Sequence, residues 1–359
     1  MERLRKLGIE AIRRVALGST VLGTGGGGDP YVGRLLAEKA VREHGEVALL
    51  DPSEVPADAC VFLCGMMGAP AVIVEKLPSG NEAVAAMEAL ARVLGRRVTH
   101  ISSLEAGGIN SMIPIAAAAR TGLPLIDADG MGRAFPELQM LLPTLEGIRA
   151  TPMSLVDEKG NTLVIDAVSN QAAEGFARVA TVQMGASATM AFYPMKGSQV
   201  ATALVPHSIS TAHRIGEALL LARQKRLDPI AEMARQLDGR EIFRGKIVDV
   251  LRRTTAGFVR GEAVVTGLEQ WSGQELSLDF QNEFLVARSA AGVLVSTPDL
   301  ICVADSEAGE PITTEALRYG QRVSVLAGPC YWRWRTPEGL AVVGPQAFGY
   351  QHSYVPLQS

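Results

Sequence analysis

The chain has 359 residues, of which 47% are hydrophobic, 20% are charged and 5% are aromatic. This length suits two domains of ordinary size, and the apolar fraction excludes a chain that is disordered over most of its length. The formal net charge is −4, with 34 Lys and Arg residues against 38 Asp and Glu residues, which excludes a strongly basic surface for nucleic acid. The first fourteen residues carry many charges and no run of about 18 apolar residues occurs, so we expect a cytoplasmic protein without a membrane-spanning segment.

The first half of the sequence predicts alternating helices and strands. Apolar residues recur at helical spacing over 3–22, and a second helix is expected over 31–43. Predicted strands over 47–50, 59–64, 98–102 and 124–127 alternate with predicted helices over 81–94 and 111–120, and 162–169 adds an edge strand. This alternation is typical of a three-layer α/β domain, in which helices cover both faces of a mostly parallel sheet.

The second half of the sequence has a different pattern. One helical stretch over 210–237 precedes short apolar runs separated by Gly, Pro, Asp and Asn. The runs cover 242–251, 257–266, 275–280, 283–288, 293–296, 300–304, 321–327 and 339–343. Such spacing favours a β sandwich or barrel. We therefore predict an α/β domain over 1–171 and a β-barrel-like domain with a helical insertion over 172–359.

The glycine-rich segment at 23–28 is the first candidate site. Glycines let the backbone approach a ligand closely, and Asp29 can cap a following helix whose free N–H groups attract an anion or a carbonyl oxygen. The predicted ligand-binding residues here are Gly25, Gly26, Gly27, Gly28 and Asp29. The segment also fits G-x-G-x-x-G, but a helical pattern precedes it where a nicotinamide site needs a strand. A simple turn between helices would need fewer glycines.

A second candidate is the segment SSLEAGGINS at 102–111, where a predicted strand meets a predicted helix. Open α/β sheets bind ligands beyond the carboxyl ends of their strands. Glu105 brings a carboxylate to this position, Gly107 and Gly108 allow close approach of the backbone, and Asn110 offers both a donor and an acceptor. A helix cap would explain Asn110 but not the other three residues.

The third candidate is DADGMGRAFPE at 127–137, which also follows a predicted strand. Asp127 and Asp129 point the same way on an extended segment, so they repel each other unless they share a proton, meet Arg133 or bind a cation. A surface loop with solvated charges is the alternative interpretation.

Several motifs together resemble the S-methyl thiohydantoin desulfurase family, whose domains occur beside hydantoinase/oxoprolinase domains. They are GTGGGGDPY at 23–31, MGAP at 67–70, EKLPSG at 75–80, EAGGINS at 105–111, DADGMGRAFPE at 127–137, QNEFLVA at 281–287, PDLICV at 298–303 and YGQRV at 319–323. The resemblance spans nearly the whole chain. It implies a three-layer α/β domain followed by a β domain, and hydrolytic removal of a methylthio group from an S-methylated thiohydantoin to give a hydantoin.

Such a hydrolysis needs an activated water, stabilisation of the charge that develops on the ring, and a proton for the leaving group. We assign Glu105 or Asp129 as the general base and include Asp127 among the catalytic carboxylates. Arg133 is expected to pair with a substrate carboxylate or with Asp127. The remaining expected binders of the ring or of an anion are Asn110, Gly107, Gly108 and the glycines at 25–28.

Two alternatives stay open. A divalent metal is a competing version of the same site, because Glu105, Asp127, Asp129 and Glu137 are hard oxygen ligands suited to Mg, Mn or Ca. The chain also lacks the standard nucleophile motifs, so a non-catalytic sensor of small molecules or an accessory subunit of a hydantoinase/oxoprolinase-type enzyme is the second hypothesis. The expected partner is a small cyclic molecule, with neither nucleic acid nor membrane; assembly into a homo-oligomer is left open.

The position of the site follows from the sheet. We predict that the segments at 23–29, 105–110 and 127–133 converge on one cleft, because parallel strands bring their carboxyl ends to one edge. The polar segment Gln281, Asn282 and Glu283 suggests that the second domain forms part of the wall, as pockets favour domain interfaces.

Overall fold

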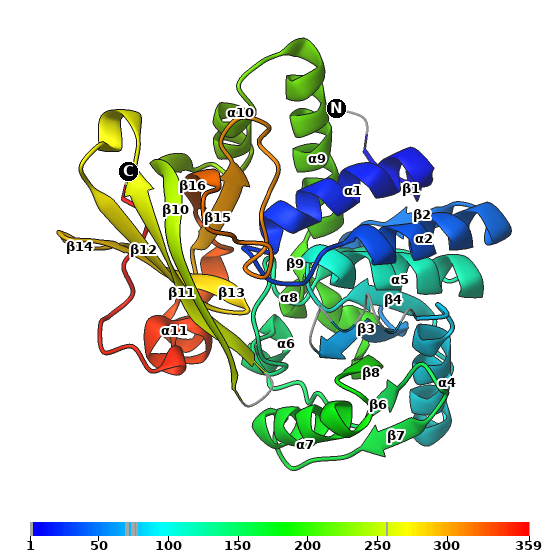
Figure 1. Cartoon of the computed structure of the whole chain (residues 1–359). Coiled ribbons are helices and arrows are strands. Elements are labelled where there is room, and N and C mark those ends of the chain that lie inside the picture. The colour runs from blue at the N-terminus through cyan, green and yellow to red at the C-terminus, as the bar shows by residue number, and fades with distance from the viewer. Residues whose placement is uncertain (1–2, 69–71, 73–75, 77, 256–257, 359) are drawn as a thin grey trace.

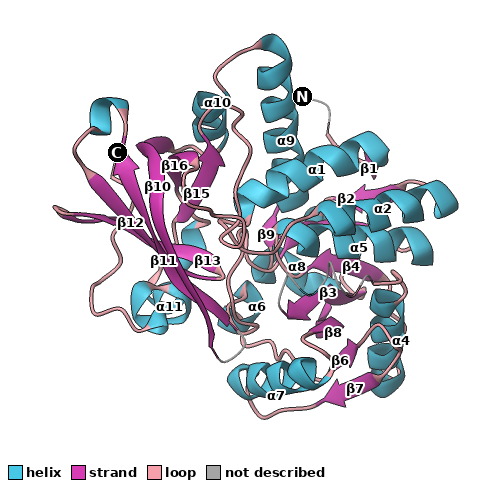
Figure 2. Ribbon diagram, viewed as in Figure 1, coloured by secondary structure: helices cyan, strands magenta, loops and turns pink. Residues whose placement is uncertain are grey.

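A computed structural model describes residues 3–68, 72, 76, 78–255 and 258–358 (Figures 1 and 2). The MGAP motif at 67–70 is therefore described only up to Gly68, and the strand predicted from residue 257 only from Phe258. Ala69 and Pro70 of the MGAP motif, and Glu75 and Leu77 of the EKLPSG motif, lie outside the described residues.

The first sheet orders its strands β1-β2-β5-β4-β3-β8-β6-β7, with β9 paired to β5. At its centre β2, β5, β4 and β3 run parallel, and β3, β4 and β5 are buried along almost their whole length, as expected where helices cover a parallel sheet. The remaining strands pair antiparallel: β1 with β2 at one end, β8, β6 and β7 beyond β3 at the other, and β9 with the central strand β5. The strands are β1 (Lys6–Leu7), β2 (Val47–Leu50), β3 (Cys60–Gly68), β4 (His100–Ser103), β5 (Leu125–Asp129), β6 (Met153–Val156), β7 (Thr162–Ile165), β8 (Ser187–Lys196) and β9 (Val205–Pro206).

Helices cover this sheet (Figure 1). The helix α5 contacts the parallel strands while α1 and α2 lie over it, so that its residues 108–119 are all buried. Farther along the sheet, α4 and α7 flank the antiparallel strands on either side, and α9 packs along α1. The helices are α1 (Ile9–Leu22), α2 (Tyr31–His44), α4 (Glu82–Leu94), α5 (Gly108–Thr121), α6 (Leu142–Leu145), α7 (Asn170–Gln183), α8 (Val200–Ala203), α9 (Ser208–Lys225) and α10 (Pro229–Gln236).

The second sheet is antiparallel throughout, in the order β14-β13-β12-β11-β10-β16-β15. Register shifts within the long strand β10 mark bulges, which bend a sheet. One face buries a separate hydrophobic core that includes Phe243, Ile247 and Phe284. The strands are β10 (Arg240–Thr255), β11 (Phe258–Gly267), β12 (Glu275–Gln281), β13 (Glu283–Ser289), β14 (Gly292–Ser296), β15 (Leu300–Asp305) and β16 (Arg322–Gly328), and α11 (Pro337–Val343) follows them.

The architecture confirms the predicted fold class, an α/β part followed by a β part, with several local corrections. The predicted helix over 3–22 begins only at Ile9, because residues 6–7 pair with β2 before Gly8. The predicted helical stretch over 210–237 is two helices, α9 and α10. The predicted strand over 339–343 is wrong: these residues end α11, which Thr336 caps by accepting a hydrogen bond from the Gly339 N–H at 3.2 Å.

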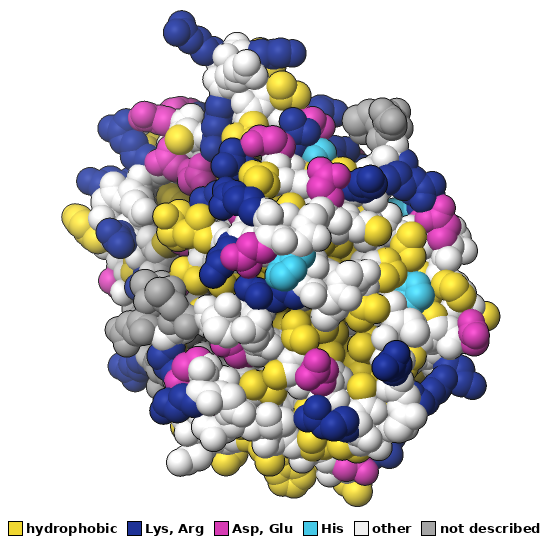
Figure 3. Space-filling view, turned by 90° about the vertical axis from the view of Figure 1, so that its right-hand side faces the viewer, with side chains coloured by type: hydrophobic (Ala, Val, Ile, Leu, Met, Phe, Trp, Pro, Cys, Tyr) yellow, Lys and Arg dark blue, Asp and Glu magenta, His cyan; other side chains and the backbone are white. Residues whose placement is uncertain are grey.

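The two sheets divide the chain unevenly. β8 and β9 come after residue 172 but complete the first sheet, and the second sheet begins only at Arg240. None of the described helices combines the length and the apolar character that a bilayer crossing needs. On the face seen in Figure 3, positive and negative side chains lie interspersed, with hydrophobic side chains among them.

Candidate active site

A cleft lies between the first sheet and the second and encloses about 790 Å3 of empty space, its open mouth included. Both halves of the chain contribute to its wall, as predicted for the second half from the polar segment at 281–283. The lining includes residues from each of the three predicted segments, namely the glycines at 25–28, Glu105 with Asn110, and Met131. From the second sheet and its loops come Asn282, Glu283, Thr314 and Glu315.

The glycine-rich segment at 23–28 lies at the interface between the two halves, here called the seam, and contacts both of them. The Gly27 carbonyl accepts from the Ile109 N–H in α5 at 2.9 Å, and the Gly25 carbonyl accepts from the Thr314 N–H at 2.8 Å. A Cβ atom on Gly26 would lie 2.0 Å from Glu283 Oε1, so no side chain fits between the segment and Glu283. The helix α2 then follows, where Asp29 Oδ1 accepts from the Tyr31 N–H at 2.8 Å; Asp29 itself is not among the lining residues.

Glu105 is the carboxylate that the first half places in the cleft. It follows β4 and is only 4% exposed. Asn110, in the first turn of α5, donates from Nδ2 to Glu105 Oε1 at 2.7 Å and accepts from the Met66 N–H at 2.6 Å, which fixes the orientation of both side chains. The pKa of Glu105 is raised to about 8, mainly by burial; the hydrogen bond from Asn110 opposes this rise and the charge of Asp129 adds to it.

Glu283 is the matching carboxylate of the second half. It begins β13 directly after Asn282, whose φ of 57° turns the chain and whose Oδ1 accepts from the Val259 N–H at 2.9 Å. Glu283 is 3% exposed, and in the described part of the chain its Oε2 has no hydrogen-bond partner. Burial, together with the charge of Glu105, holds the pKa of Glu283 well above its usual range. The sequence predicts Glu283 only as part of the wall, because the polar segment at 281–283 is its one signal.

Asp129 lies behind Glu105 rather than in the cleft lining. Its Oδ2 accepts three backbone hydrogen bonds, from Ala106 at 2.8 Å, Met131 at 3.0 Å and Gly132 at 2.7 Å. Burial raises the pKa of Asp129 to about 6, against the lowering effect of these N–H groups. Through Ala106, the neighbour of Glu105, Asp129 fixes the backbone that carries the cleft carboxylate. Gly107 and Gly108 pack against the glycine-rich segment, since a Cβ on Gly108 would lie 2.2 Å from the Gly28 carbonyl oxygen.

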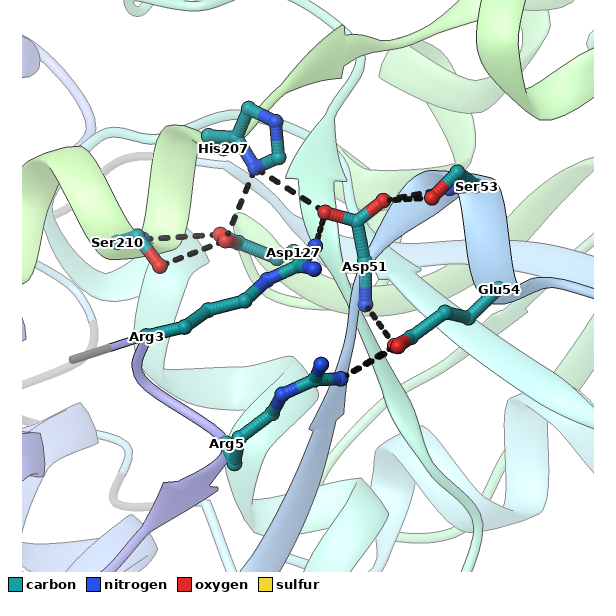
Figure 4. Close-up of polar contacts among 8 residues, drawn as sticks. All are labelled: Arg3, Arg5, Asp51, Ser53, Glu54, Asp127, His207 and Ser210. Carbon is teal, nitrogen blue, oxygen red and sulfur yellow. Dashed lines mark hydrogen bonds and ion pairs between the residues drawn. The ribbon is translucent and has the colours of Figure 1, made fainter.

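Asp127 belongs to a second polar cluster, drawn in Figure 4. It accepts from Ser210 at the start of α9, at 2.9 Å from N and 2.6 Å from Oγ. His207 Nδ1 lies 3.5 Å from Asp127 Oδ2 and 3.8 Å from Asp51 Oδ2, and Arg3 pairs with Asp51. Asp127 and Asp129 therefore enter different networks, and Asp127 is not part of the cleft lining.

Arg133 donates all five of its N–H groups, two within the first half and three to the second half. Nε donates to Ala134 O at 3.0 Å, and Nη1 donates to Pro298 O at 3.0 Å and to Asp299 O at 2.7 Å. Nη2 donates to Thr24 Oγ1 at 2.6 Å and to Phe284 O at 3.3 Å. No donor is left for a substrate carboxylate or for Asp127, the partners expected from the sequence.

The carboxylates considered for a metal do not form one ligand set. Asp127 is bonded to Ser210, and Asp129 Oδ2 is occupied by three N–H groups. Among the described residues, no group of three or more His, Cys, Asp or Glu side chains is placed to hold a metal ion. The glycine-rich segment follows the helix α1 and not a strand, unlike the nicotinamide-binding turn.

Comparisons with known proteins agree with this architecture. A crystal structure of a protein from Chromobacterium violaceum, a structural genomics target, superimposes with a TM-score of 0.82 at 23% sequence identity, covering 99% of this chain and 100% of the other. A search of curated proteins gave no match. Two family models match, the S-Me-THD-like N-terminal domain over residues 10–167 and the S-Me-THD-like C-terminal domain over residues 168–357. The chain therefore belongs to the S-methyl thiohydantoin desulfurase-like family, as its motifs indicated.

Proposed function

We propose that this protein is a hydrolase that removes the methylthio group from a small cyclic S-methyl thiohydantoin, giving a hydantoin and methanethiol. The observation that carries the proposal is the pair of buried carboxyl groups, Glu105 and Glu283, which the two halves bring to one cleft. Two interacting carboxyl groups in a low-dielectric site hold on to a proton, so one can serve as base while the other serves as acid.

The reaction is a displacement at the carbon between the two ring nitrogens. Water adds to this carbon and gives its proton to the base, the carbon–sulfur bond breaks, and the departing thiolate takes a proton from the acid. Glu105 is the base in this proposal, because the N–H of Asn110 favours its ionised form. Glu283 is the acid, because its Oε2 receives no hydrogen bond in the described part of the chain, which favours the protonated form.

Other parts of the wall suit the rest of the substrate. The N–H groups of Gly27 and Gly28 donate to no protein acceptor within the described residues, and they are available for a ring oxygen or for developing negative charge. Four methionines, Met66, Met67, Met131 and Met190, also line the cleft. Their polarisable thioethers provide a soft apolar surface for a methylthio group.

The test is methanethiol release by the purified chain, followed with a thiol reagent, together with chromatography of the hydantoin product. Glu105→Gln and Glu283→Gln should each lower turnover at least about a hundredfold, the range for losing a general acid or base. Asp157→Asn is the matched control, because Asp157 is also buried but caps the turn between β6 and β7. Binding of a hydantoin without thiol release would contradict the proposal and support the sensor or accessory-subunit role.

A further inference from the structure

The outer part of the cleft carries more negative charge than the proposed reaction requires. Besides the two central carboxyls, Glu137 and Glu315 line it, and both are half-buried. Within the described part of the chain neither forms an ion pair; Glu137 accepts only from Gln139 Nε2. The two carboxylates thus line the cleft without a close ion pair, although the charge of Arg252, which is not among the lining residues, acts on Glu315.

The single cation among the described lining residues, Arg178, is already engaged. Its Nε donates to Glu174 Oε1 at 2.6 Å and its Nη2 to Pro136 O at 3.2 Å, while the guanidinium lies 4.2 Å from the centre of the Phe258 ring. Glu174 is itself buried and also accepts from the Leu138 N–H at 2.9 Å. The charge of Arg178 is therefore balanced by Glu174, and the segment 69–75 contains no Lys or Arg in its sequence.

A second, independent observation points to a ligand with hydrogen-bonding groups at this place in the cleft. Glu283 Oε2 lies in the lining, fully buried and without a hydrogen-bond partner among the described residues. A buried polar atom of this kind costs free energy unless a ligand group reaches it. The protonated Glu283 carboxyl both donates and accepts a hydrogen bond, so a ring that presents an N–H group beside an acceptor would satisfy it.

We infer that the cleft takes thiohydantoins whose ring substituent is uncharged or cationic and discriminates against substituents that carry a carboxylate, with Glu137 and Glu315 as the specificity-determining residues. This inference rests on the proposed function and names the substrate class of the same site. Because charges in a partly buried cleft are weakly screened, a like charge near either carboxylate should lower kcat/KM at least about tenfold.

Two isosteric substrates isolate the effect of charge from that of shape. S-methyl thiohydantoins bearing a 2-carboxyethyl or a 2-carbamoylethyl substituent at ring position 5 differ only in an oxygen replaced by an NH2 group, and a 4-aminobutyl compound adds a cation. For the unmodified protein we expect kcat/KM for the amide to exceed that for the acid at least about tenfold.

Glu137→Gln and Glu315→Gln should each reduce the amide-to-acid ratio and lower the preference for the aminobutyl compound. Glu338→Gln, at an exposed glutamate of α11, is the control and should keep the ratio. Equal kcat/KM for acid and amide, or a ratio that neither cleft variant changes, would overturn the inference. If none of the three compounds releases thiol, the proposed function fails instead. The inference is then tested by calorimetric binding of the three corresponding hydantoins, where equal affinities would refute it.

Discussion

Replacing Glu105 by Gln should make the protein more stable, by an amount that grows with pH. Burial raises the pKa of Glu105 from 4.5 to about 8, so between these values the folded state keeps a proton that the unfolded chain has released. Stability is then fully present below about pH 4.5 and falls as pH rises through 8. At about 1.4 kcal/mol per pKa unit, this raised pKa corresponds to about 5 kcal/mol of stability, which is lost progressively up to about pH 8.

Gln keeps an oxygen for the hydrogen bond from Asn110 and cannot ionise, so the variant escapes this loss. Urea unfolding of both proteins at several values between pH 5 and pH 9 measures the difference, which should be small at pH 5 and level off above pH 8. Glu275→Gln, at an exposed position of β12, serves as the control. A stability difference that does not change with pH would refute the reasoning, because a merely structural change of side chain carries no proton linkage.

Four further outcomes follow from the same geometry. The kcat/KM for thiol release should rise with pH through about 8, since the base Glu105 must ionise; a pH–rate profile that is flat from 6 to 9 would contradict this role. Gly26→Ala should lower turnover at least about a hundredfold with only a modest loss of stability, because its Cβ would lie 2.0 Å from Glu283 Oε1 and displace that side chain. Turnover and urea unfolding are measured on one preparation, and unchanged turnover would contradict this prediction. Arg133→Met should lower the free energy of unfolding in urea by about 3–5 kcal/mol, since it removes a buried charge-assisted network and leaves carbonyl groups unpaired. The stability of Arg133→Lys should lie between those of Arg133→Met and the unmodified protein. Asp127→Ala should cost about 1–2 kcal/mol by removing the cap of α9, and an unchanged unfolding midpoint would contradict that assignment.

The parallel strands could be predicted because burial on both faces makes them continuous apolar runs, as in β3. The same signal misleads at 339–343, where five small and apolar residues fit either a strand or a helix. Thr336 and Pro337, which begin α11, carry the decisive local information. No element was predicted over β8, whose place between β3 and β6 depends on pairing with residues more than a hundred positions earlier.

The candidate site was predictable where the position in the sheet fixes it. Glu105 and Asn110 lie at the end of β4 and the start of α5, as the strand–helix pattern indicated. Glu283 could not be recognised as its partner, because a carboxylate beside a β turn is normally solvated and becomes buried only when the two halves dock. Asp127 and Asp129 are two positions apart on β5, yet Asp127 accepts hydrogen bonds from α9 and Asp129 accepts them from the loop at 130–132.

The division of the carboxyl pair between the two halves explains why the seam is so heavily hydrogen-bonded. Glu105 and Glu283 come from different halves and lie buried at one cleft, so the cost of burying the two carboxyl groups together opposes docking. The bonds from Phe284 and Thr314 to the glycine-rich segment, and those from Arg133 to the second half, oppose that cost. The absence of side chains at 25–28 lets this backbone lie directly against Glu283 and Phe284. The same contacts that hold the halves together therefore help to bury the carboxyl pair, and the raised pKa of the proposed base depends on this burial.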